Sequence, residues 1–193
     1  QIYHFIDENE DIVRPFNYPP DTPGRGWTIT EANHRQVAVV VAMGNVYVST
    51  LTSPFQEIMG IVDDLHAQGV KTIIVDMHAE ATSEKLAFAR YLDGKVSAVI
   101  GTHTHIPTAD AQILPEGTAY QTDVGMVGPV DSVIGMKVEA SINRFLTQRR
   151  VKFQQSEDDA FLFQAVLLEI DGDGRAQHIE RIDKRMTIER TRI

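Results

Sequence analysis

The sequence contains no cysteine, and this absence excludes a disulfide framework and any thiolate metal ligand. It is consistent with a reducing compartment, and we expect a cytoplasmic protein. No apolar run approaches the length of a membrane span, so we expect no membrane partner. Basic residues are scarce: 18 lysines and arginines stand against 27 aspartates and glutamates, a net charge of −9. That charge disfavours bulk DNA or RNA as a partner but allows a small nucleotide drawn to a local metal charge.

The middle of the chain predicts a βαβ unit. Two short apolar runs, 72–75 and 96–100, flank a helix-like stretch at 84–92. A strand, a helix and a second strand in this order make the two strands parallel. The length of 193 residues is enough for a sizeable core, and we expect residues 1–193 to form a single domain.

Helices and hairpins are expected on either side of this unit. Ser53-Pro54 should begin a helix that ends at Gly69, and another helix is expected over 136–146. The remaining expectations are hairpins at 26–43, 109–121 and 161–188, an extended piece at 46–48, a helix end at 1–9, and loops at 14–26 and 122–129. A pure doubly wound fold would lack these hairpins, so we predict an α/β fold with mixed sheets in layers.

Three histidines follow the two central strands. His103 and His105 come directly after the second strand, and in extended backbone residues at this spacing project from one face. His78 follows the first strand, and parallel strands end at the same edge of a sheet. We therefore predict that the three imidazoles converge. Such a site suits Zn, Mn, Fe or Co and does not suit Ca or Mg.

Other roles stay open for these residues and for the acidic residues near them. A single histidine after a strand is more often a hydrogen-bonded loop residue, and only the joint placement of three favours a metal. Asp76, Glu80 and Asp123 lie close in sequence to the predicted ligands. One or more of them could orient an imidazole through its second ring nitrogen, or act as a helix cap or turn residue instead. The loop at 14–26 is either a surface crossover or a segment that closes over the site.

Three segments carry a family resemblance: VDMHAEATSEK at 75–85, GTHTHIPTAD at 101–110 and TDVGM at 122–126. Together with Arg14-Pro15, Asn17 and TPGRG at 22–26, they closely resemble the YmdB-type phosphodiesterases of the calcineurin-like metallophosphoesterase superfamily. The resemblance covers essentially the whole chain.

This resemblance implies a layered α/β/β/α sandwich with a two-metal site at the strand ends. It implies hydrolysis of phosphodiesters, notably 2′,3′- and 3′,5′-cyclic nucleotides. His78 and His103 would be ligands of one metal and His105 of the other. The cofactors would be two divalent or mixed-valence transition metals. Fe and Mn are the first expectation, and Zn and Co are the alternatives. We also expect a homo-oligomer.

The family pattern has parts that these 193 residues lack. The family's first strands carry an Asp, a Glu-Asn pair and a Gly-Asn-His segment, which supply the other ligands, the bridging carboxylate and the general-acid histidine. The sequence begins at Gln1, inside an apparent helix. We therefore expect it to be about the carboxy-terminal three quarters of the domain, without the amino-terminal strands and with the general-acid histidine upstream of residue 1.

Two alternatives remain. One is a capsule-synthesis-type member of the same superfamily, which also places His-x-His after a strand; the match at 122–126 argues against it. The other is an inactive, truncated metallophosphoesterase remnant that acts as an interaction module.

Overall fold

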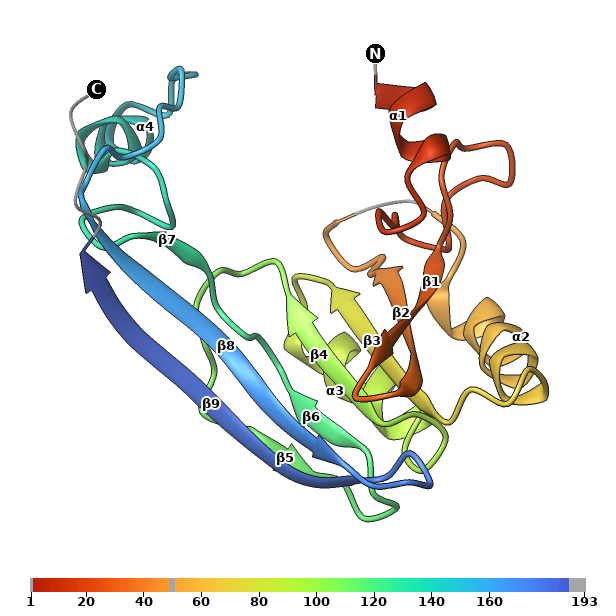
Figure 1. The fold of residues 1–193 in the computed structure, drawn as a ribbon. Helices are drawn as coiled ribbons and strands as arrows, with labels where there is room; N and C mark the ends of the chain where they lie inside the picture. Colours follow the sequence, from red (N-terminus) through yellow and green to blue (C-terminus); the bar gives the residue numbers. More distant parts are fainter. Residues whose placement is uncertain (1, 49–50, 188–193) are drawn as a thin grey trace.

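The computed structural model describes residues 2–48 and 51–187 and contains two sheets (Figure 1). The larger sheet has the strand order β1-β2-β3-β4-β6-β5, and the smaller has the order β7-β8-β9. The larger sheet comprises β1 (Trp27–Ala32), β2 (Arg35–Met43), β3 (Thr72–His78), β4 (Ala98–Thr102), β5 (Gln112–Ile113) and β6 (Ala119–Gln121). The smaller comprises β7 (Val127–Pro129), β8 (Ala160–Ile170) and β9 (Ala176–Thr187).

The predicted βαβ unit is confirmed. β3 and β4 are parallel neighbours joined by α3 (Thr82–Tyr91), and β2 and β6 continue the parallel pairing on either side. Burial explains their composition, since β4 is buried along most of its length and β3 along one face and at its start. Strands covered on both faces read as continuous apolar runs, which is the pattern that the sequence shows at 72–75 and 96–100.

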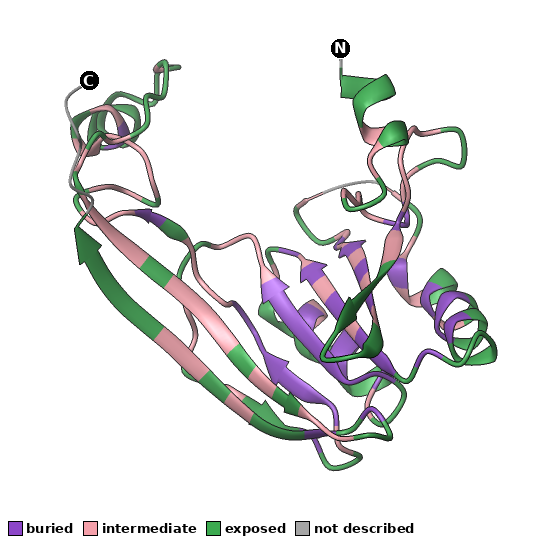
Figure 2. Ribbon diagram, viewed as in Figure 1, coloured by how far each residue is buried: buried purple, intermediate pink, exposed green. Residues whose placement is uncertain are grey.

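Helices α2 (Pro54–Ala67) and α3 cover one face of the larger sheet, and the smaller sheet covers part of the other. One cluster of buried apolar residues joins both helices to β2, β3 and β4. A second, smaller cluster joins Ile100 and Ala119 to partly buried residues of β8 and β9. Figure 2 shows the burial concentrated in the central strands. This layered α/β arrangement confirms the predicted fold class.

Helix α2 follows the sequence signals closely. Pro54 occupies its first turn, and Gly69, with φ of 85°, follows its carboxyl end. Ile58, Val62 and Leu65 lie on its buried face, where each side chain contributes roughly 1.5–3 kcal/mol. The other helices are α1 (Ile2–Glu8) and α4 (Val138–Thr147). In the described parts of the chain, none of the helices has the length and apolarity to cross a membrane.

Two predictions for segments outside the histidine loop differ from the structure. Residues 127–129, expected in a loop, form β7, because they find an antiparallel partner in Phe161–Phe163 of β8. Residues 46–48, expected to be extended, form a turn in which Tyr47 has a φ of 63°. The Glu84 carboxylate explains this turn, since it accepts hydrogen bonds from the backbone amides of Asn45 and Val46.

The proline- and glycine-rich loop at 14–26 is anchored to the sheet. The Arg14 guanidinium donates to the carbonyl oxygens of Pro15, Thr22 and Pro23, which closes the loop on itself. Asn17 is almost fully buried, donates to the carbonyl oxygens of Met43 and Thr52, and accepts from the Met43 amide. The loop is therefore held at the carboxyl end of β2.

Asn17→Ala should lower the free energy of unfolding by about 2 kcal/mol, because it removes a buried side chain that forms three part-buried hydrogen bonds with backbone groups. Asn9→Ala is the matched control, since the Asn9 amide bonds one carbonyl oxygen in an exposed position. Urea unfolding of both variants measures the difference. Equal effects of the two substitutions would contradict this account of the loop.

Candidate active site

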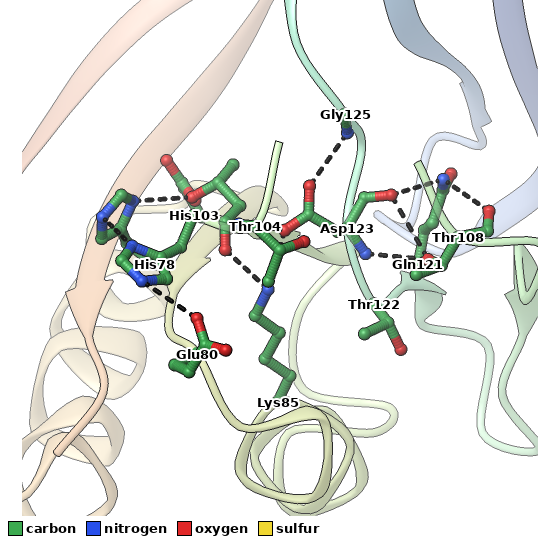
Figure 3. Close-up of polar contacts among 12 residues, drawn as sticks. His78, Glu80, Lys85, His103, Thr104, Thr108, Gln121, Thr122, Asp123 and Gly125 are labelled. Atoms are coloured by element: carbon green, nitrogen blue, oxygen red, sulfur yellow. Dashed lines mark hydrogen bonds and ion pairs between the residues drawn. The ribbon is translucent and has the colours of Figure 1, made fainter. Parts of the chain in front are cut away.

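The ends of β3 and β4 place two imidazole rings in contact. His78 is the last residue of β3 and pairs in register with Thr102, the last residue of β4, after which His103 follows. Nδ1 of His103 lies 3.1 Å from Nε2 of His78 (Figure 3). The rings meet edge to face with their centroids 4.8 Å apart. The structure thus brings His78 and His103 together at the shared edge of the sheet.

His105 has a different partner. Its Nδ1 lies 3.3 Å from the carbonyl oxygen of Ile134. The expectation of extended backbone through this segment is wrong, because φ is 102° at His103 and 65° at His105. Regular pairing ends at Thr102, and the Thr104 amide donates to the Asp123 carboxylate instead of to a strand. The spacing of two residues therefore does not place both rings on one face by strand geometry.

A hydrogen-bonded chain fixes the proton of His78. The Thr102 hydroxyl donates its proton to Asp76 at 2.7 Å, and its oxygen lies 3.0 Å from Nδ1 of His78. Because that hydroxyl has only one proton to give, His78 Nδ1 must be the donor in the second contact. The lone pair of the neutral ring then lies on Nε2, which faces His103.

Burial shifts the pKa at both ends of this hydrogen-bonded chain. It raises the pKa of Asp76, against the hydrogen bond from Thr102, which lowers it. It also lowers the pKa of His78, and the neighbouring His103 lowers it further. Near neutral pH, His78 is therefore an uncharged imidazole, the form in which histidine binds metals.

Glu80 contacts the opposite side of His103. Its Oε2 lies 3.2 Å from Nε2 of His103, and its side chain is half exposed. Glu80 comes just before α3, whose N-cap residue Ala81 offers no side-chain cap. Of the two roles left open by the sequence, the geometry places Glu80 on an imidazole rather than on the start of the helix.

Asp123 binds Lys85 and two backbone amides. It forms an ion pair with Lys85, with 2.9 Å between Nζ and Oδ2, and both side chains are fully buried. Its carboxylate also accepts from the amides of Thr104 and Gly125. It connects the loop that carries His103 to the glycine-rich loop, so its contribution to the site is indirect.

Two of these residues, Lys85 and Thr102, were not among the sequence candidates. Lys85 precedes the buried Phe88 and Ala89 by three and four residues, so helical periodicity alone assigns it to the core face of α3. A lysine there requires a buried partner. Thr102 is the polar end of an otherwise apolar strand beside a histidine, a position suited to orienting a ring.

The donor chemistry of the histidine pair fits a transition metal. Two imidazoles lie edge to face, one has its lone pair directed into their contact, and a carboxylate adjoins the other. In residues 2–48 and 51–187, however, no three histidine, aspartate or glutamate side chains gather in an arrangement that could hold a metal ion. The described residues therefore contain no complete metal site.

A family model for YmdB-like proteins matches residues 1–182. The chain belongs to the YmdB-like family. The family is one of calcineurin-like phosphoesterases, and the chain is a phosphoesterase by this membership. A 2′,3′-cyclic-nucleotide 2′-phosphodiesterase of Bacillus subtilis is 46% identical over 185 residues, which cover 94% of this chain and 69% of that protein.

Two solved structures share the YmdB-like fold. A hypothetical protein from Thermus thermophilus is 42% identical, with a TM-score of 0.87 over 95% of this chain and 71% of that one. A phosphatase from Mycoplasma pneumoniae is 33% identical, with a TM-score of 0.83 over 96% of this chain and 68% of that one. The likeness therefore extends across almost all of this chain and about two thirds of its relatives.

Thr102→Val should release the proton of His78 from Nδ1, because valine keeps the shape of threonine but offers no oxygen to the ring. Nitrogen-15 NMR of the imidazole in metal-free protein near pH 8 measures the tautomer. We expect one tautomer in the unmodified chain and a mixture in the variant. Thr102→Ser keeps the hydroxyl and should behave as the unmodified chain does. Identical tautomer populations in Thr102→Val would disprove the hydrogen-bonded chain.

Proposed function

We propose that this YmdB-like chain belongs to a metal-dependent phosphodiesterase that hydrolyses 2′,3′- and 3′,5′-cyclic nucleotides through a two-metal site. The observation that carries the proposal is the contact between His78 and His103, in which the lone pair of His78 Nε2 is held toward the second ring. The cyclic-nucleotide activity named for the Bacillus subtilis relative supports the substrate class.

In this proposal, His78 and His103 bind one metal and His105 binds the other. Fe or Mn are the first expectations, with Zn or Co as the alternatives that suit imidazole ligands. Divalent metals at such a centre supply Lewis-acid activation of water and neutralise the charge of the phosphate. A homo-oligomer and a cytoplasmic location remain expectations from the sequence.

The chain's own residues prepare the ligands. Asp76 and Thr102 keep the His78 proton on Nδ1, so that Nε2 stays available. Glu80 adjoins Nε2 of His103 and orients that ring. These contacts hold two ligand side chains in place without help from a metal, which reduces the rearrangement that metal binding requires.

A second candidate function is an interaction module without catalysis. The observation that favours it is the absence, among the described residues, of any group of three potential ligands. The two candidates differ in whether the chain binds metal and turns over a cyclic nucleotide.

His103→Ala should reduce both bound Mn²⁺ and hydrolysis of 2′,3′- and 3′,5′-cyclic nucleotides by about tenfold or more, because it removes a ligand. Its thermal midpoint should stay within about 3 °C, since the side chain is one-third exposed. His34→Asn is the control, because His34 is fully exposed in a turn. Full metal content and turnover in His103→Ala would refute the ligand assignment. An unmodified chain that neither binds Mn²⁺ nor hydrolyses either nucleotide would favour the interaction module.

A further inference from the structure

Behind the two histidines lies a buried ion pair that the proposed chemistry does not use. The side chains of Lys85 and Asp123 are both fully buried and 2.9 Å apart. Figure 3 shows Lys85 rising from α3 to the loop that carries His103, with Asp123 beside it. The described residues contain no other ion pair in which both partners are fully buried.

The pair binds the backbone on both sides of His103. Lys85 Nζ donates to the carbonyl oxygen of Thr102 at 2.6 Å. The Asp123 carboxylate accepts from the amide of Thr104 at 3.0 Å. The peptide groups next to His103 are therefore both tied to one pair of charges.

His103 needs such a restraint because its backbone conformation is unfavourable. Its φ of 102° lies in a region that residues with a Cβ rarely occupy. Conformations of this kind cost about 1–3 kcal/mol and persist only where the surroundings impose them. Without the two contacts, the residue would relax toward an ordinary conformation, and its ring would turn away from His78.

Asp123 is itself held firmly enough to serve as an anchor. Its second carboxylate oxygen accepts from the Gly125 amide at 2.9 Å. Its backbone carbonyl accepts from the amide of Thr108 at 3.0 Å and from the side chain of Gln121 at 2.8 Å. Asp123, which lies in the loop after β6, thus anchors His103, which lies in the loop after β4.

Stability alone does not account for this pair. Replacing a buried ion pair by apolar residues of similar volume is often neutral or stabilising. An apolar pair, however, cannot bond the Thr102 carbonyl and the Thr104 amide. We propose that Lys85 and Asp123 are positioning residues that hold His103 against His78; the consequence for metal binding rests on the proposed function, but the positioning itself does not.

Hydrogen exchange of the metal-free, unmodified chain provides the first test. The Thr104 amide lies in a loop, yet it should exchange at least about a hundredfold more slowly than the Asp173 amide. The Asp173 amide is a matched control, because it donates to the exposed Asp171 carboxylate at 2.9 Å. Equal exchange rates at the two amides would overturn the proposal without any substitution having been made.

The second test removes both charges. Lys85→Met/Asp123→Leu leaves no unpaired buried charge, so its thermal midpoint should lie above that of Lys85→Met alone. The nuclear Overhauser contact between the His78 and His103 rings should nevertheless be lost, and Thr104 exchange should rise by about tenfold or more. Mn²⁺ binding should weaken about tenfold or more. The same substitutions at Lys71 and Asp173, an exposed ion pair also separated by 2.9 Å, should change none of these properties.

Different results would contradict the positioning role and the metal centre. If the folded double variant keeps the ring contact and slow Thr104 exchange, the positioning role is wrong, whatever the metal affinity. If the unmodified chain binds no Mn²⁺, the proposed metal centre fails, while the ring contact and the exchange rates still decide the positioning role. If the double variant does not fold, the exchange comparison in the unmodified chain decides alone.

Discussion

The ion pair between Lys85 and Asp123 is the interaction on which the geometry of the site depends. Two opposite charges without water must satisfy each other and every remaining donor and acceptor. They do so through backbone groups of Thr102, Thr104 and Gly125. Because the buried charges need these backbone partners, the ion pair restrains two loops that contain no regular secondary structure.

This restraint explains how irregular segments reach a defined arrangement at the edge of the sheet. Strand pairing ends at Thr102, and beyond it the chain has no ladder of hydrogen bonds to follow. The loop after β6 lies against Gly101 so closely that a Cβ there would overlap the carbonyl of Thr122. Glycine is thus required for the loop to approach, and Asp123 then binds both loops together.

Apolar sequence patterns correctly predicted the buried strands. They failed where the conformation of a segment depends on a partner that lies far away in the sequence. The apolar runs at 72–75 and 96–100 predicted β3 and β4, and parallel pairing then brought His78 to His103. Strand periodicity could not predict the backbone at His105, because the Asp123 carboxylate, not a neighbouring strand, binds the Thr104 amide. β7 was missed for a similar reason: its three residues become a strand only because β8 lies beside them.

Thr102 links the two polar networks of the site through different atoms. Its hydroxyl joins Asp76 to His78, while its carbonyl oxygen accepts from Lys85. A movement of Thr102 would therefore affect both the tautomer of His78 and the backbone restraint on His103. Substitutions in the two networks should consequently show non-additive effects, since residues that share a partner couple energetically. The relative placement of the two imidazoles thus depends on the end of β4 as a whole, and separate contributions cannot be assigned to single residues.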